Sequence, residues 1–521
     1  MWMQAAILLA ALLLRVHRIG VHEFWLDETF SFQDATAVHW AWDLRLRDMP
    51  PLYTVLLHGW IGVAGTDEGA LRLLSALLGT LAVGATMWLA RQMGGPRAVV
   101  PAGVVAALAP MHVYYSQEAR PYAILLLLIP VILGLVHRAA THDRVRDWVP
   151  VCLVATVILY THYLGGLALL GTAGMLLVAP SRRVPNRWAV SMAVAGLLFL
   201  PWVAWSFLLV SHSTAGLGWI ADAWARTPWA IPRSLEMFVI GPRAGALSIT
   251  LKQFDTLTYP EPLRWLALSA AGALALWLVV PAGNAPLGSG LGARVVALVV
   301  SMLTPLVVLL LVSFVKPIYL VGRYDMLGFP AFPVLMGLAW AKLEAVGLPR
   351  ARVVVPALAA ACLLPVAVKL FRYYTQPAVH PENSAAAAER LAAKLASGDV
   401  VLFPDLRGHV VLYQLARRGW AWRGDQCEQD ASGMRVGCDV LPPAALDAAV
   451  RGDAAPLRDA LGRALDDHPG AVFIVHGTWA VGANGPMVLP GDVAVIGELG
   501  RLGYRPGPGD WEVGITEYRR P

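Results

Sequence analysis

The chain has 521 residues, of which 57% are hydrophobic and only 15% are charged, and its mean hydropathy is +0.58. Soluble domains usually carry about 25% charged residues, so this composition excludes a disordered chain and argues against an ordinary cytosolic enzyme. The formal net charge of +6 is more typical of arginine-rich cytoplasmic loops than of nucleic-acid binding. We therefore expect a polytopic membrane protein and no nucleic-acid partner.

Hydropathy divides the chain into an apolar part, residues 1–371, and a more polar part, residues 372–521. An α-helix needs about 20 apolar residues to cross a bilayer, and the apolar part offers many such runs. We expect about eleven spans, at residues 2–18, 69–92, 97–111, 121–137, 148–160, 164–180, 188–210, 263–281, 294–315, 324–342 and 353–371.

The polar part has the pattern of a soluble α/β domain. Short β-rich runs at 400–403 and 472–475 alternate with an amphipathic, alanine-rich stretch at 386–395 and with turns that contain glycine and proline. No catalytic motif stands out in this part. Cys427 and Cys438 lie in a polar stretch, and we expect them to form a disulfide, with two free thiols as the alternative.

Charges in the loops predict the orientation of the spans. Alternate loops are rich in arginine and should be cytoplasmic. With an odd number of spans, the polar part then lies on the outer side. Arg15 and Arg18, which follow the first span, would by themselves place that end inside, but the summed loops predict the opposite.

The first outward loop contains the string WLDETFSF at residues 25–32, in which Asp27 and Glu28 stand among aromatic residues. A carboxylate that aromatic side chains partly shield from water can act as a general base. The alternative interpretation of Asp27 is a helix N-cap, because a carboxylate at that position satisfies free backbone N–H groups.

The later outward loops add aromatic and charged residues at the ends of spans. These are Glu118, Arg120, Tyr122, His162, Tyr163, Lys316, Arg323 and Tyr324. Cations at the membrane interface suit a phosphate that is itself attached to a lipid. Each arginine alone could instead be an interfacial residue whose charge reaches for water, and His162 alone could be a hydrogen-bonded residue at a helix end. Together, these residues favour a binding site.

Several strings together resemble the GT-C-fold glycosyltransferases, and among them the bacterial relatives of the protein O-mannosyltransferases and the lipid A aminoarabinose transferase. The matching strings are WLDE (25–28), PPLYTVLLHGW (50–60), ALRLLSALLGTLAV (70–83), YSQEARPYA (115–123), LYTHYLG (159–165) and GRYDMLGFPAF (322–332). The resemblance covers about the first 370 residues. It implies a multi-pass enzyme of the bacterial inner membrane that transfers a sugar from a polyprenyl-phosphate donor to an acceptor on the outer face. The family usually inverts the anomeric centre.

Carried over to this sequence, the resemblance makes Asp27 the candidate base or acceptor-orienting group, with Glu28 as its neighbour. Family members have a second acid shortly before the Pro-Pro pair, and Asp48 is the nearest match. Many relatives have a histidine directly before that pair, whereas this chain has Met49, which puts a metal or acceptor role of this position in doubt. Basic residues near the donor phosphate correspond to Arg120, Lys316 and Arg323.

A sugar on a lipid phosphate already has a good leaving group. The protein therefore has to position and deprotonate the acceptor and to offset negative charge on the departing phosphate. A divalent cation between Asp27 and Asp48 could assist, but no ligand spacing identifies one. The expected partners are the lipid-linked donor, membrane lipid and a lipid, glycan or protein acceptor. The alternative function is a lipid or polysaccharide transporter that makes no bonds, which would normally carry polar residues near the bilayer midplane.

Overall fold

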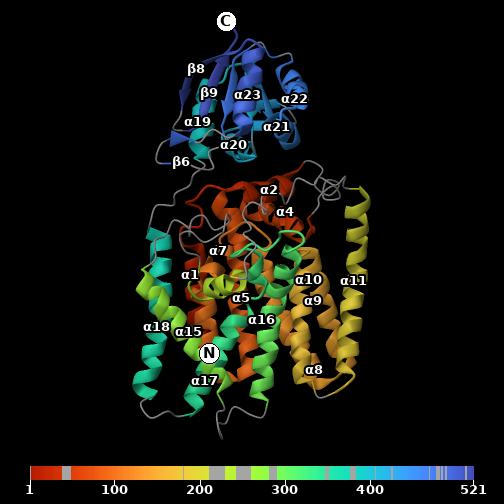
Figure 1. Cartoon of the computed structure of the whole chain (residues 1–521), viewed down its shortest axis with the longest axis vertical. Helices are drawn as coiled ribbons and strands as arrows, with labels where there is room; N and C mark the ends of the chain where they lie inside the picture. Colours follow the sequence, from red (N-terminus) through yellow and green to blue (C-terminus); the bar gives the residue numbers. More distant parts are fainter. Residues whose placement is uncertain are drawn as a thin grey trace. The chain divides into compact units, whose positions relative to one another are not determined.

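The structure, a computed structural model, describes residues 2–37, 49–179, 181–209, 229–241, 260–280, 290–346, 351–375, 383–404, 406–423, 426–466, 468, 470–476, 481–482, 485–486, 490–510 and 513–521. The chain folds into two compact units (Figure 1). The first consists of Met1–Val21 and Asp34–Ala378. The second consists of Val379–Pro521 together with the short N-terminal segment His22–Gln33.

The first unit is helical throughout the part that the structure describes. Its α-helices are α1 (Trp2–Val16), α4 (Leu52–Ala64), α5 (Glu68–Gly94), α6 (Pro96–Leu108), α7 (Pro110–Tyr115), α8 (Tyr122–His142), α9 (Trp148–Thr161), α10 (Gly165–Gly171), α11 (Val184–Leu209), α13 (Ala230–Ile240), α15 (Glu261–Val279), α16 (Leu291–Ser313), α17 (Ala331–Val346) and α18 (Ala351–Thr375). Short 3₁₀ helices are η2 (Val145–Asp147), η3 (Thr172–Val178) and η5 (Tyr324–Leu327).

Among the described residues, six helices are long and apolar enough to cross a membrane, namely α5, α8, α11, α15, α16 and α18. Four shorter stretches, at α1, α4, α6 and Gly165–Val178, are apolar as well. The predicted polytopic helical architecture is therefore confirmed, while the number of eleven spans stays a prediction.

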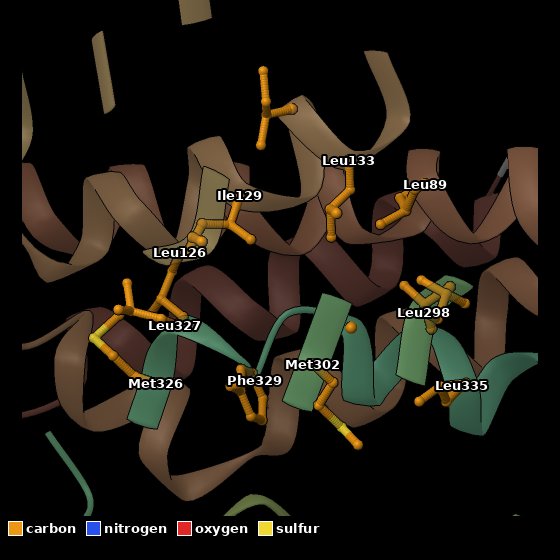
Figure 2. Close-up of a cluster of buried hydrophobic side chains, with 14 of the residues drawn as sticks. Leu89, Leu126, Ile129, Leu133, Leu298, Met302, Met326, Leu327, Phe329 and Leu335 are labelled. Carbon is orange, nitrogen blue, oxygen red and sulfur yellow. The ribbon is translucent and has the colours of Figure 1, made fainter. Parts of the chain in front are cut away.

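The core of the first unit joins helices that are far apart in the sequence (Figure 2). Leu89 of α5 and Leu133 of α8 belong to the same buried cluster as Leu298 of α16. Met326 and Leu327 of η5 are also part of it and are 1% and 3% exposed. The short turn η5 is therefore anchored in the core by its own apolar side chains.

Arg15, at the end of α1, is completely buried. Its guanidinium donates to the carbonyl oxygens of Ala106 and Ala107 in the last turn of α6, at 3.4 and 3.3 Å, and to Nδ1 of His112 at 2.8 Å. An arginine in this position donates hydrogen bonds to the carbonyl oxygens that a helix C-terminus leaves without a partner in the helix. Arg15 is thus a structural residue and not a loop charge, so it does not bear on the orientation of the spans.

The second unit is built on a seven-stranded mixed sheet in the order β2-β3-β4-β1-β5-β9-β8. β1 pairs in parallel with β4 and β5, and the other pairings are antiparallel. The strands are β1 (Val400–Phe403), β2 (Trp420–Arg423), β3 (Gln426–Gln429), β4 (Arg435–Val440), β5 (Val472–Val475), β8 (Arg505–Asp510) and β9 (Ile515–Arg519), with a separate small pair β6 (Val481–Gly482) and β7 (Gly485–Pro486).

Helices cover both faces of this sheet because successive strand residues point to opposite sides. Val401 and Phe403 of β1 pack with α19 (Ser384–Lys394) and α20 (Arg407–Ala416). Val400 and Leu402 pack on the other side. The helices on that side are α21 (Pro443–Val450), α22 (Ala455–Leu465) and α23 (Pro490–Arg501). The predicted α/β fold of this part is confirmed, and β1 and β5 span the residues expected from the sequence.

Cys427 and Cys438 form a disulfide that joins the neighbouring strands β3 and β4. Both residues are buried, at 1% or less exposure, and their Cα atoms lie 5.7 Å apart. The predicted pairing is confirmed. Such crosslinks persist in oxidising compartments and are rare in the cytosol.

Candidate active site

The loop before α17 presents Arg323 from a tight turn. Gly322 has φ +83°, a left-handed conformation that glycine adopts without strain. Its N–H donates to Oδ2 of Asp325 at 3.0 Å, and its carbonyl oxygen accepts a hydrogen bond from the Tyr115 hydroxyl. Together with the buried side chains of η5, these bonds fix the backbone that carries Arg323.

Arg323 is held against Tyr122, the first residue of α8. Nε of Arg323 donates to the Tyr122 hydroxyl at 2.7 Å, and the guanidinium carbon lies 5.7 Å from the centre of the Tyr122 ring and 5.5 Å from that of Tyr324. The Arg120 guanidinium lies 5.9 Å from the same Tyr122 ring. Two segments about 200 residues apart in the sequence thus bring two cations to one aromatic side chain.

His162 completes this group, which we call the arginine cluster: Arg120, Tyr122, His162, Arg323 and Tyr324. The His162 ring lies 6.2 Å from the Tyr122 ring and 6.1 Å from the Tyr324 ring, between centroids. Its Nδ1 accepts a hydrogen bond from the N–H of Leu164 at 3.1 Å, which assigns the proton of the neutral ring to Nε2. His162 therefore offers a donor from a helix end.

Burial, followed by the positive charges of Arg120 and Arg323, lowers the pKa of His162 to about 3. The imidazole is consequently neutral at physiological pH, and the positive charge of the cluster comes from the two arginines. An Nε2–H group and two guanidiniums are all hydrogen-bond donors. Such a set is suited to an anion with several oxygens, such as a phosphate.

Two buried acids stand in the segments that carry Arg120 and Arg323. Glu118 is 4% exposed and Asp325 is 0% exposed. Oδ2 of Asp325 accepts the hydrogen bond from the Gly322 N–H at 3.0 Å. Through this contact with Gly322, Asp325 stabilises the turn that carries Arg323, so its role is structural.

Two predicted site residues lie apart from the arginine cluster. The Tyr163 hydroxyl accepts from Nε1 of Trp202 at 3.0 Å and lies 3.3 Å from the Ser206 hydroxyl, so this side chain contacts α11. Lys316 is exposed just after α16. The structure thus brings together Arg120, Tyr122, His162, Arg323 and Tyr324 from the prediction. Glu118 is buried two residues before Arg120, and its side chain interacts with Tyr114.

The predicted carboxylates of the first outward loop begin helix α2 (Leu26–Thr36). Glu28 is 1% exposed, and its Oε2 accepts from the Trp25 N–H at 3.4 Å, which is one half of a capping box. Asp27 stands in the same first turn and is half-buried. The helix cap, which was the alternative interpretation of Asp27, is therefore made by Glu28. Asp48 lies outside the described residues.

Several residues without a predicted role support the site. Gln117 donates from Nε2 to the carbonyl oxygens of Arg15 and His17, both at 3.0 Å, and accepts from the Tyr373 hydroxyl at 2.8 Å. Gln117 thereby links the turn before Arg120 to the end of α1 and to α18. The one sequence signal for these supporting residues is their position inside the quoted strings, which contain Tyr115, Gln117 and Asp325.

No group of three or more histidine, cysteine, aspartate or glutamate side chains is arranged to hold a metal ion within the described ranges. By its own side chains, the arginine cluster can bind an anion and stabilise negative charge.

Residues 48–205 match the sequence profile of the family described as dolichyl-phosphate-mannose-protein mannosyltransferase. No curated protein matches the sequence. The fold is similar to that of ArnT from Cupriavidus metallidurans in the apo state, with a TM-score of 0.58, 14% identity, and coverage of 99% of this chain and 96% of that chain. The structure of the same protein bound to undecaprenyl phosphate gives a TM-score of 0.57, 15% identity, and coverage of 99% and 97%.

An oligosaccharyltransferase from Archaeoglobus fulgidus is more distant, with a TM-score of 0.49, 12% identity, and coverage of 90% of this chain and 69% of that chain. The similarity to ArnT extends over nearly the whole of both chains. It confirms the predicted GT-C fold with its C-terminal α/β domain.

Proposed function

We propose that this chain is a membrane glycosyltransferase that moves a sugar from a polyprenyl-phosphate-linked donor to an acceptor. The observation that carries this proposal is the arginine cluster, in which two guanidiniums and a neutral imidazole are fixed by hydrogen bonds and aromatic rings. The match of residues 48–205 to a lipid-phosphate-dependent transferase family supports it, as does the fold shared with a protein that binds undecaprenyl phosphate.

In the proposed reaction, Arg120 and Arg323 bind the phosphate of the donor. As the bond between the anomeric carbon and the phosphate oxygen breaks, negative charge grows on the leaving phosphate. Guanidiniums that are already in place stabilise this charge without reorganising, and the buried surroundings strengthen the interaction. His162 donates a hydrogen bond from Nε2 and does not transfer a proton, because it is neutral and a poor base.

Asp27 is proposed as the general base that removes the proton of the acceptor nucleophile. It is half-buried in the first turn of α2, where the helix dipole favours a carboxylate. Glu28 supports it by capping the helix, and Asp48 remains a proposed second acid. Attack on the face opposite the phosphate would invert the anomeric centre. A divalent cation near Asp27 and Asp48 remains a separate hypothesis.

We further propose that residues 1–371 form the transferase domain and that residues 372–521 form an extracytoplasmic domain in a bacterial inner membrane. The disulfide between Cys427 and Cys438 supports an oxidising location. The transferred group is a hexosyl or pentosyl unit, and the acceptor is a lipid, a glycan or a protein. A transporter is not favoured, because the charged residues gather at helix ends.

The proposal is tested with purified protein in liposomes that contain a polyprenyl-phosphate sugar labelled in the sugar. Envelope extracts from cells that lack the protein supply the acceptor. We expect label to leave the lipid-phosphate fraction and to appear in an acceptor fraction, and Arg323→Ala should slow this transfer. A transporter would instead move intact labelled lipid between leaflets, which would contradict the proposal.

A further inference from the structure

The segment His22–Gln33 belongs to the same compact unit as the C-terminal domain, although the two are separated by more than 340 residues. Glu23 shows how it is attached. Its two carboxylate oxygens accept hydrogen bonds from the backbone N–H groups of Ser384 and Ala385, at 2.9 and 3.2 Å. These are the first N–H groups of α19, which no earlier turn of the helix can satisfy.

The N-cap residue of α19 does not bond to these N–H groups with its own side chain. Asn383, the N-cap residue, has φ +41° and makes no side-chain capping hydrogen bond. The Glu23 carboxylate takes its place and also places a negative charge at the positive end of the helix dipole. One end of the first-loop segment is therefore fixed to the C-terminal domain by a tertiary helix cap.

Aromatic contacts fix the rest of the segment to α20. Tyr413 lies 4.9 Å from the Phe24 ring and 5.0 Å from the Phe32 ring, and His409 lies 5.0 Å from the Phe30 ring, between centroids. His409 and Tyr413 are four residues apart and therefore share one face of α20. We call these five residues the aromatic clamp. Its members Phe24 and Phe30 stand on either side of Asp27 in the sequence.

We propose that the C-terminal domain positions the carboxylates of the first outward loop for catalysis, through Tyr413 and through the N-terminus of α19, which Glu23 of the loop binds. This inference rests on the proposed role of Asp27. A base has to lie within hydrogen-bond reach of the group that it deprotonates, and a misplacement of about 1 Å can cost about 100-fold in rate. The clamp and the cap hold α2 at both sides of Asp27, so loosening them should reduce kcat.

The experiment compares Tyr413→Ala, Tyr413→Phe and a matched control, Leu457→Ala, in the full-length protein. Leu457 is fully buried on α22, on the opposite face of the sheet from the clamp, and its replacement perturbs the same domain without touching the segment. Rates are measured per folded protein in the labelled-donor assay, with kcat and KM for the donor determined separately. Each variant is also combined with Asp27→Asn.

We expect Tyr413→Ala to lower kcat about 10- to 100-fold with little change in the donor KM, Tyr413→Phe to keep most of the activity because both ring contacts remain, and Leu457→Ala to act normally per folded molecule. In the Asp27→Asn background, Tyr413→Ala should cause no further loss, because both changes remove the same function. If Tyr413→Ala does not fold, Phe32→Leu, which removes one ring contact from the loop side, takes its place.

Two results would overturn the inference. One is an equal loss of rate in Tyr413→Ala and Leu457→Ala, which would mean that the domain contributes stability alone. The other is a full additional loss from Tyr413→Ala in the Asp27→Asn background. If Asp27→Asn by itself keeps normal turnover, the catalytic assignment fails, and the positioning role fails with it.

Discussion

Replacing Arg323 by alanine should weaken the binding of polyprenyl phosphate. Arg323 is 6% exposed, and its guanidinium is held by the Tyr122 hydroxyl at 2.7 Å and by two aromatic rings. A hydrogen bond to a charged group contributes about 1.5–3 kcal/mol, and each 1.4 kcal/mol corresponds to a factor of ten. We therefore expect the Kd for the lipid phosphate to rise about 10- to 100-fold.

Arg323→Lys is the matched control. Lysine keeps the positive charge, but it lacks the planar guanidinium whose several N–H groups can bond to Tyr122 and to a phosphate at the same time. It should restore only part of the affinity. Tyr122→Phe removes the hydroxyl that orients Arg323 and should weaken binding less than Arg323→Ala does. The assay is equilibrium binding of polyprenyl phosphate to detergent-solubilised protein, which needs no acceptor. Wild-type affinity in Arg323→Ala would refute the assignment of the cluster to the donor phosphate.

Asp27→Asn should lower turnover by about 10²–10⁴-fold, the usual contribution of a general base, with an unchanged melting temperature; normal turnover would identify Asp27 as a structural residue. Gly328→Ala should destabilise the first unit by about 1–3 kcal/mol, because the added Cβ would lie 2.4 Å from the carbonyl oxygen of Met302; an unchanged melting temperature would speak against this packing. Cys427→Ser should lower the unfolding free energy of the C-terminal domain by about 2–3 kcal/mol, and reductant should have the same effect on the wild type alone. The pKa of His162 is lowered from an ordinary 6.5 to about 3, so His162 stabilises the fold above pH 6.5 and loses this contribution as the pH falls towards 3; His162→Gln should flatten the pH dependence of stability in that window, and an unchanged slope would count against the burial of a neutral ring.

Much of the architecture could be predicted from local sequence patterns. Apolar runs of sufficient length identify α5, α8 and α16, and β-rich runs identify β1 and β5, because hydropathy and residue type act over a few neighbouring residues. The quoted strings identify the residues of the arginine cluster as candidates. The spacing of Arg120 and Tyr122 near the start of one helix, and of Arg323 and Tyr324 near another, places each pair at a helix end.

The rest depends on contacts between distant residues, which a single sequence does not encode in a readable form. Tyr163 is next to His162 in the sequence, but the backbone turns there and sends its side chain to Trp202. Arg15 looked like a loop charge and is instead a buried donor to carbonyl oxygens of α6. The bond of Glu23 to α19 crosses 361 residues, and no local pattern predicts it.

The most direct measurement of the central claim is the fate of the donor lipid during turnover. Purified protein is incubated with a polyprenyl-phosphate sugar and an envelope acceptor fraction, and the lipid products are quantified by mass spectrometry. We predict that free polyprenyl phosphate accumulates, one molecule for each sugar that appears in the acceptor fraction, and that Arg323→Ala and Asp27→Asn reduce both products together. Donor lipid that stays intact while it changes leaflet, with no free polyprenyl phosphate formed, would contradict the claim that this chain is a glycosyltransferase.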